Sequence, residues 1–367
     1  MKRRLLSSLT ILFSLFTSDI RTSLAFARDS VRIVGSPVVL NFAEQVAKRY
    51  AQNWAFPAPT MVPTGTGVGF GLFCAGVGFQ HPDINVASRR MTAAELLTCK
   101  QNGVTSVTEV EFGLDAIVLV SSKEHEIMNL RPIDIHRALA RQVVASNEII
   151  RNNTQSWSVI NPGLPSIPIE VMGPAEDSPI MYGFLEKVMA ASCVALPQMA
   201  ALNEDKRYRT CRSLRTDNAF HAGLKNEARI IDWVRENPNA LAVVDFMMYQ
   251  RNQDALLAHR IDGKSPTTET MHMGEYPLTT SLYIYVKNQH VDAISGLQNL
   301  LYEFTSERAI SPEGYLSDRG FVAVDDIARN RARDNAISLR PLTVETLDER
   351  YELNCIVDFY DWSASAR

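Results

Sequence analysis

The sequence lacks the patterns that mark most metal sites and active sites. Its five cysteines form no CxxC pair, and no Cys/His spacing suits zinc. Its seven histidines are scattered singly, outside any HExxH or nucleophile-elbow context. The isolated triplet Met271-His272-Met273 hints at a soft-metal site but is more typical of a loop. No residues of the sequence pair a nucleophile with a base, so a hydrolase is not indicated. We expect a protein that is not an enzyme and has no cofactor or metal.

The sequence also has no excess of positive charge. It holds 37 Lys and Arg against 41 Asp and Glu, a formal net charge of -4, and no long basic stripe. A protein that binds nucleic acid or an anionic membrane surface usually gathers Lys and Arg on one face. We therefore expect no nucleic-acid partner.

No apolar run is long enough to span a bilayer, which takes about 20 residues. The first 27 residues instead resemble a secretory signal. Lys2, Arg3 and Arg4 precede the apolar residues 5–16, and Ala25-Phe26-Ala27 has the small-x-small form of a cleavage site. We expect cleavage after Ala27 and export to the periplasm as a soluble protein; a membrane anchor is the alternative that the short run disfavours.

Export changes how the cysteines are interpreted, because disulfides form in oxidising compartments. Cys74 with Cys99 would close a separation of 25 residues, and Cys193 with Cys211 one of 18. Cys355 is then left without a partner. Buried free thiols remain the alternative.

Apolar runs alternate with helical periodicity, which predicts an α/β fold of two lobes for a chain of this length. The run at 116–120 (AIVLV) leads into a new block of helices, and 280–286 (TSLYIYV) returns late. We predict lobe one at 28–117 plus 283–367 and lobe two at 118–282, with a charged, loop-like tail from about Asp325. Strands are expected at 30–34, 61–62, 84–87, 107–112, 116–120, 240–246 and 280–286, and helices from 39 and over 133–144, 179–191, 226–236 and 291–305.

Three predicted strands end in loops suited to an anion. The loop at 65–71 (GTGVGFG) fails as a dinucleotide fingerprint because Phe70 takes the sixth position, and it lacks the GK[ST] of a P-loop. Its backbone N–H groups can still converge on an anion where a helix begins, and Thr66 adds a hydroxyl. Ser36 follows the first strand, and Ser88 with Arg89 follows the third. Since ligands bind at the carboxyl ends of such strands, we expect an oxyanion there.

Nine short motifs in order resemble the PstS-type phosphate-binding protein family, especially its alphaproteobacterial branch. Among them are GTGVGFGLFCAG, HPDINVASRRM, EVEFGLDAIVLV, SLRTDNAF, EYPLTTSLYIYV and EGYLSDRGF, and the likeness spans about 31–324. The resemblance implies a type II periplasmic binding fold, two α/β lobes joined by a two-stranded hinge. It also implies a monomer that captures phosphate in the interlobe cleft and delivers it to an ABC permease. Relatives of this kind carry cysteine pairs where Cys74/Cys99 and Cys193/Cys211 stand.

The same resemblance implies the ligand residues and reveals two departures. GSST is usual at the first loop, whereas Pro37 and Val38 stand here, and the second-lobe SGTR is replaced by Ser178 followed by Pro-Ile-Met. The alternative is therefore a degenerate site that binds another ligand or serves a structural role in the envelope. The implied ligand residues are Ser36, Val38, Val39, Thr66, Gly67, Ser88, Arg89 and Ser178.

Overall fold

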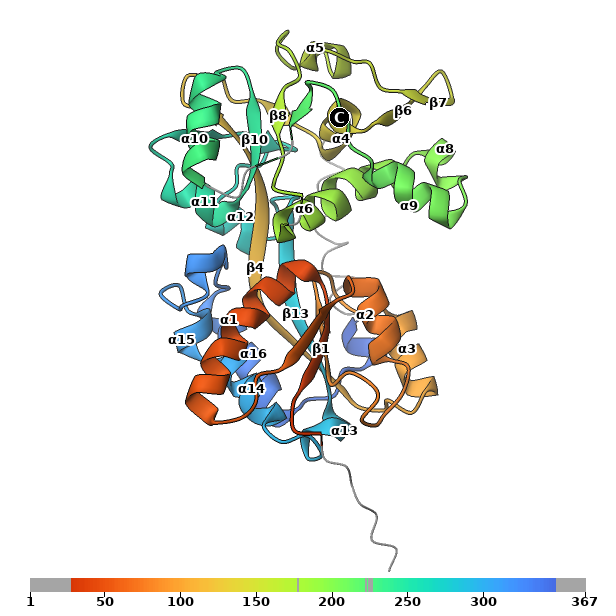
Figure 1. The fold of residues 1–367 in the computed structure, drawn as a ribbon, viewed down its shortest axis with the longest axis vertical. Coiled ribbons are helices and arrows are strands. Elements are labelled where there is room, and N and C mark those ends of the chain that lie inside the picture. The colour runs from red at the N-terminus through yellow and green to blue at the C-terminus, as the bar shows by residue number, and fades with distance from the viewer. Residues whose placement is uncertain (1–27, 177, 222, 224–226, 348–367) are drawn as a thin grey trace, which may run out of the picture.

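The computed structural model describes residues 28–176, 178–221, 223 and 227–347. These residues form two lobes, placed one above the other in Figure 1. The predicted leader and Cys355 lie outside the described residues.

The sheet of lobe one contains β1 (Arg32–Gly35), β2 (Thr60–Pro63), β3 (Ile84–Ala87), β13 (Thr279–Lys287) and the first part of β4 (Val107–Ser122). Its order is β2-β1-β3-β13-β4. The first three strands are parallel, and β13 runs antiparallel to both of its neighbours. The carboxyl ends of β1, β2 and β3 therefore meet at one edge, which faces lobe two.

Helices cover both faces of this sheet. Leu282, Ile284 and Val286 of β13 pack in the same core as α1 (Pro37–Trp54), whereas Tyr283 and Tyr285 point to the opposite face. This alternation is the two-residue period of a strand. The face that carries α1 also carries α14 (Leu297–Phe304), α15 (Glu307–Ile310) and α16 (Asp326–Ser338). The opposite face carries α2 (Thr66–Phe73) and α3 (Ala93–Gln101). The lobe is completed by α13 (Asn288–Val291) and the 3-10 turn η2 (Ser317–Arg319).

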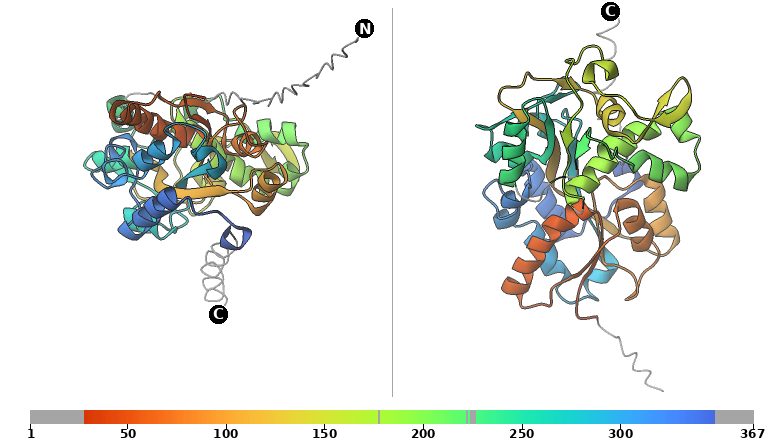
Figure 2. Two further views of the ribbon diagram at one scale, coloured as in Figure 1. Left: turned by 90° about the horizontal axis from the view of Figure 1, so that it is seen from below. Right: turned by 45° about the horizontal axis from the view of Figure 1, so that its top comes forward.

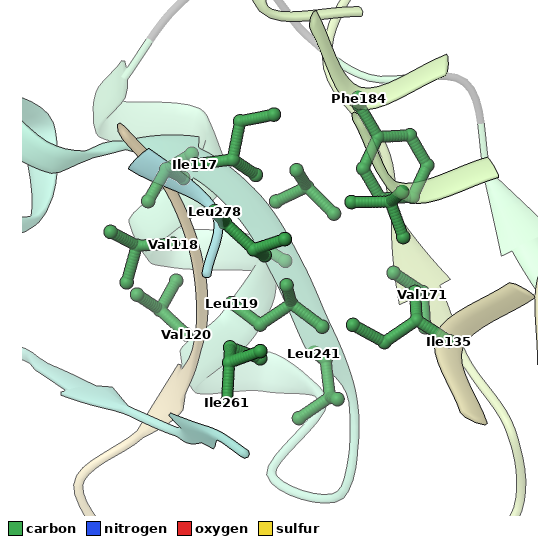
Figure 3. Close-up of a cluster of buried hydrophobic side chains, with 14 of the residues drawn as sticks. Ile117, Val118, Leu119, Val120, Ile135, Val171, Phe184, Leu241, Ile261 and Leu278 are labelled. Carbon is green, nitrogen blue, oxygen red and sulfur yellow. The ribbon is translucent and has the colours of Figure 1, made fainter. Parts of the chain in front are cut away.

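Lobe two is built on the second part of β4. It pairs with β10 (Leu241–Asp245) and β11 (Leu256–Ala258), and the sheet continues through β8 (Val171–Met172) to β9 (Phe220–His221). Figure 3 shows the apolar core around it, where Val118, Leu119 and Val120 meet Val171 and Leu241. The remaining elements are β5 (Asn129–Leu130), β6 (Gln142–Ala145), β7 (Glu148–Arg151), β12 (Arg260–Ile261), α4 (Pro132–Leu139), α5 (Trp157–Ile160), α6 (Pro179–Phe184), the π-helix η1 (Leu185–Ala190), α7 (Ala191–Val194), α8 (Pro197–Ala200), α9 (Glu204–Arg212), α10 (Glu227–Glu236), α11 (Phe246–Arg251) and α12 (Thr268–His272).

The strand β4 connects the lobes (Figure 1), and Figure 2 shows the two lobes from two further directions. Its residues 107–116 pair with β13 and its residues 117–120 with β10. The register between β4 and β13 shifts between Leu282 and Tyr283. Such a bulge bends a strand locally, here at the crossing between the lobes.

Several sequence-based expectations differ from the structure. The helix expected over 291–305 is replaced by α13 and α14, and the strands expected at 107–112 and 116–120 are one strand, β4. The described part of the tail after Asp325, which extends to residue 347, begins with the helix α16, whose Arg329, Ala332 and Ala336 are buried. Its periodicity was hidden because small alanines and the stem of an arginine, not large apolar residues, face the core. The helix expected over 133–144 ends at Leu139, since β6 and β7 form a hairpin whose turn holds Asn147 at a φ of 67°.

The two predicted disulfides are confirmed. Cys74 bonds to Cys99 with a Cα–Cα distance of 4.1 Å, and Cys193 bonds to Cys211 with one of 5.4 Å. The first joins the end of α2 to α3, and the second joins α7 to α9.

Candidate functional site

A cleft of about 790 Å³ lies between the lobes, beside the carboxyl ends of the lobe-one strands. Lobe one contributes two loops, lobe two contributes α6, η1, α7 and α9, and the wall between them is the start of β13. The lining residues are Thr64, Gly65, Thr66, Gly67, Val68, Ser88, Arg89, Arg90, Tyr182, Glu186, Lys187, Ala191, Tyr208, Arg212, Pro277, Thr279, Ser281 and Tyr283.

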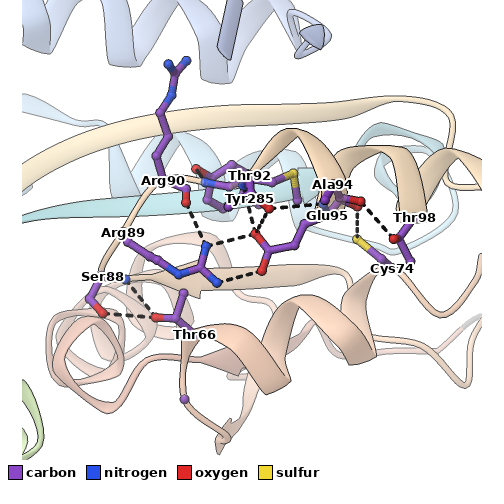
Figure 4. Close-up of polar contacts among 12 residues, drawn as sticks. Thr66, Cys74, Ser88, Arg89, Arg90, Thr92, Ala94, Glu95, Thr98 and Tyr285 are labelled. Atoms are coloured by element: carbon purple, nitrogen blue, oxygen red, sulfur yellow. Dashed lines mark hydrogen bonds and ion pairs between the residues drawn. The ribbon is translucent and has the colours of Figure 1, made fainter. Parts of the chain in front are cut away.

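Two hydroxyls of lobe one are paired at the cleft. The Oγ atoms of Thr66 and Ser88 lie 3.1 Å apart, and the Ser88 amide donates to Thr66 Oγ1 at 3.2 Å (Figure 4). Thr66 is the first residue of α2, so the amides of this first helical turn have no carbonyl partner within the helix. The glycine loop therefore presents hydroxyls and backbone donors at the same point.

Arg89 lies beside these hydroxyls but already has a carboxylate partner. Its Nη1 and Nη2 donate to Glu95 at 2.9 and 2.7 Å, and its guanidinium lies 5.4 Å from the ring centre of Phe70. Burial alone would raise the pKa of Glu95, but hydrogen bonds from Arg89 and from Thr92 outweigh it, and the pKa is lowered. The Arg89 side chain keeps 45% exposure, so it can contact a ligand from its fixed position.

Lobe two supplies a second arginine, opposite the first. Arg212 of α9 donates to both oxygens of Glu186, each at 2.7 Å, and stacks 3.9 Å from the ring centre of Tyr208. Glu186 lies on η1, and π-helical turns are frequent at functional sites. The neighbouring Lys187 donates to the backbone oxygen of Thr279 on β13.

The charge of the cleft is positive but largely balanced. Arg90 is held by Glu109 at 2.8 Å, so each of the three lining arginines has a carboxylate partner. Lys187, by contrast, donates to a carbonyl. A bound oxyanion would meet charges that are already oriented, which lowers the entropy lost on binding.

The hinge places an acid behind Lys187. Asp115 of β4 has a buried Oδ1 without a hydrogen-bond partner. Burial, and then the charge of Asp245, raises the pKa of Asp115 to about 8. Burial lowers the pKa of Lys187 to about 8, against the attraction of Asp115. A rise in the pKa of the acid means that the folded chain holds a proton which the unfolded chain releases near pH 4.

Stability should consequently fall with rising pH. Between pH 4 and about 8 the unfolded chain has lost the Asp115 proton while the folded chain keeps it, so the free energy of unfolding decreases over this window. The substitution Asp115→Asn removes this titration. We expect the melting temperature of the natural protein to fall relative to Asp115→Asn between pH 5 and pH 8. Parallel curves for the two proteins would contradict the raised pKa.

The structure brings together half of the expected ligand residues. Thr66, Gly67, Ser88 and Arg89 line the cleft. The remaining four, Ser36, Val38, Val39 and Ser178, do not line it.

Those four residues have other roles in the fold. Ser36 is buried, and its amide donates to the Val86 carbonyl at 2.8 Å. Val38 and Val39 belong to the core of lobe one. Ser178 caps α6 by accepting from the Met181 amide at 3.1 Å.

Sequence reasoning missed the lobe-two residues Tyr182, Lys187, Tyr208 and Arg212. On a helix, aromatic and basic side chains of this kind resemble an ordinary solvated face, and no motif marks them. A signal was present only in Cys211, whose predicted disulfide fixes the helix that carries Arg212.

No metal site appears among the described residues, which contain no group of three or more His, Cys, Asp or Glu suited to a metal ion. His272 of the Met-His-Met triplet instead contacts the Ala323 carbonyl at 2.7 Å. Within the same described part, no helix is both long and apolar enough to cross a membrane.

Comparisons with known proteins place this chain among binding proteins. The sequence profile of the PBP superfamily domain matches residues 22–308. The chain is 22% identical over 295 residues to the phosphate-binding protein PstS of Staphylococcus saprophyticus, covering 79% of each protein. It is 25% identical over 262 residues to the protein SphX of Synechocystis, covering 70% of this chain and 68% of that one.

Solved structures share the fold. A protein from Planctomyces limnophilus, described as a possible phosphate binding protein, superposes with a TM-score of 0.68 at 20% identity, over 84% of this chain and 98% of that one. PstS from Borrelia burgdorferi gives 0.55 at 17% identity, over 81% and 100%. These likenesses show that the two lobes form a type II periplasmic binding fold.

Proposed function

The chain belongs to the PBP superfamily, and from this premise we propose that it captures phosphate in the interlobe cleft and delivers it to an ABC permease. Its relatives are named as phosphate-binding proteins, and a solved neighbour from Vibrio cholerae is an ABC-type phosphate transport receptor. Its role is thus binding and transport and not catalysis. Export by the leader, with cleavage after Ala27, and action as a monomer are part of the proposal. So is the division into lobe one (28–117 plus 283–367) and lobe two (118–282).

The observation that carries the proposal is the pair of oriented arginines on opposite walls. Arg89 comes from lobe one and Arg212 from lobe two, and each is fixed by a carboxylate. Arginine matches the geometry of tetrahedral oxyanions, and the hydroxyls of Thr66 and Ser88 add neutral donors beside it. An anion that contacts both walls would hold the lobes closed.

Calorimetry with phosphate tests the proposal. We expect Arg89→Ala and Arg212→Ala each to weaken binding about tenfold to a hundredfold, since each removes a charge-assisted contact worth roughly 1.5 to 3 kcal/mol. Arg209→Ala is the matched control. Arg209 lies on the same helix as Arg212, but its side chain is 69% exposed and pairs with Asp205.

A thermal melt gives a second readout. Phosphate at about 100 times its dissociation constant should stabilise the natural protein by about 2.7 kcal/mol. Tight binding that both arginine variants retain would refute the assigned site. If millimolar phosphate neither binds nor stabilises the protein, the proposed ligand is wrong.

A different ligand in the same cleft is the second candidate. It is favoured by the start of α6, where Pro179 offers no amide and Met181 is buried in the lobe-two core. Lobe two therefore presents no loop of backbone donors there, and a phosphate would depend on side chains instead.

A further inference from the structure

Tyr182 reaches from lobe two into the glycine loop of lobe one. It lies on α6, yet its ring packs against the core cluster of lobe one. Its hydroxyl lies against the start of α2, beside the backbone of Gly65 and Thr66. The contact is close, because a Cβ on Gly65 would lie only 2.6 Å from Tyr182 Oη. Glycine is thus required at position 65 both by its φ of 81° and by the approach of this phenol.

The neighbouring residue of α6 covers the start of α1. A Cβ on Gly183 would lie 3.5 Å from Cγ2 of Val38, in the first turn of that helix. In Figure 1, α6 correspondingly lies over the end of α1 that faces lobe two. One short segment of lobe two therefore lies against the starts of two helices of lobe one, α1 and α2.

The amide of Thr66 lies in the first turn of α2, beside the paired hydroxyls of the cleft. It belongs to the same residue whose Oγ1 lies 3.1 Å from Ser88 Oγ. Burial, and then the charge of Glu186, raises the pKa of Tyr182 to about 12, so the phenol is neutral at physiological pH. A neutral oxygen is a weaker acceptor than an oxyanion, which makes this contact one that an anion can displace.

We propose that Tyr182 is an internal competitor for the ligand, whose hydroxyl occupies the amide at the start of α2 and so sets how tightly an oxyanion binds. The inference rests on the proposed function, since it concerns the same cleft. An incoming phosphate either displaces the phenol, at the cost of its packing, or binds only to the cleft side chains and not to this amide. In both cases the affinity is lower than the open site would give.

Phosphate calorimetry on three variants tests the proposal. Tyr182→Ala frees both the amide and the space of the ring, and we expect binding about tenfold to a hundredfold tighter, the worth of one hydrogen bond to an anion. Tyr182→Phe frees the amide but keeps the ring, and we expect affinity equal to that of the natural protein or a few-fold higher. Tyr302→Ala, at an exposed tyrosine of α14 outside the cleft, should leave the affinity unchanged. Circular dichroism and melting confirm that each variant is folded.

The possible outcomes test the competitor role of Tyr182 separately from the proposed binding of phosphate. If the natural protein binds phosphate and Tyr182→Ala binds no tighter, the function stands and the competitor is refuted. If Tyr182→Phe binds about tenfold more weakly, the hydroxyl is a ligand and not a competitor. If only Tyr182→Ala binds, the competitor stands and phosphate is not the natural ligand. If no variant binds, both proposals are overturned.

A measurement without phosphate checks the contact itself. In amide NMR spectra of the ligand-free protein, Tyr182→Phe should move the Thr66 resonance because it removes the acceptor. The resonance of Gly71, at the solvent-exposed far end of α2, should stay in place. An unmoved Thr66 resonance would refute the competitor.

Discussion

Gly35→Ala should destabilise the protein by about 3 to 5 kcal/mol, more than any other single substitution considered for this chain. Gly35 ends β1 with a φ of 134°, a conformation that side chains disfavour. A Cβ there would lie 1.9 Å from the Val86 carbonyl oxygen, which belongs to β3 and also accepts from the Ser36 amide. Because backbone atoms cannot move aside singly, β1 and β3 would have to separate. Urea unfolding of the purified variant measures the loss.

Gly71→Ala is the matched control for this prediction. Gly71 lies inside α2 and is exposed, and a Cβ there meets nothing within 4 Å. Alanine should therefore stabilise the helix by about 0.5 to 1 kcal/mol. If Gly35→Ala unfolded at the same urea concentration as the natural protein, the close packing of β1 against β3 would be disproved.

Removal of the Cys74–Cys99 disulfide should have the second-largest effect. Replacement of both cysteines by alanine frees a loop with a separation of 25 residues, which costs roughly 3.5 kcal/mol on the loop-entropy estimate. Both cysteines are buried, so the urea midpoint should fall clearly. The loss should also reach the cleft, because the bond joins the helix that begins at Thr66 to the helix that carries Glu95, the partner of Arg89.

The second disulfide provides the comparison. Replacement of Cys193 and Cys211 by alanine frees a separation of 18 residues and should cost roughly 3.2 kcal/mol. Loss of this disulfide loosens α9, which carries Arg212, whereas loss of the Cys74–Cys99 disulfide loosens α3, which carries Glu95. If a double replacement left both the urea midpoint and the phosphate affinity unchanged, the corresponding disulfide would contribute neither to stability nor to the cleft.

The sequence by itself determined the elements whose signals are local. The part of β4 at 116–120 is a short apolar run, and the fully buried strand β3 is apolar except for Asn85. The turn residues after the strands placed Thr66, Gly67, Ser88 and Arg89 at one edge of a sheet, because parallel strands share the direction of their ends. The sequence also predicted both disulfides from the expected oxidising compartment, but each bond forms only because the fold brings its two Cα atoms within 4.1 or 5.4 Å.

The tertiary structure alone decided which lobe-two residues join the cleft and how its charged residues are paired. Arg89 is held by Glu95 and Arg212 by Glu186, pairs that depend on rotamers and helix orientation. The Ser36 amide donates to the Val86 carbonyl, because β1 and β3 lie side by side, and so it is not free to bind a ligand. Tyr182 contacts the glycine loop although more than 100 residues separate them, and no local pattern encodes a contact between two lobes. Local sequence fixes where a chain bends and which face it buries, whereas the docking of one lobe on the other depends on all the surfaces they share.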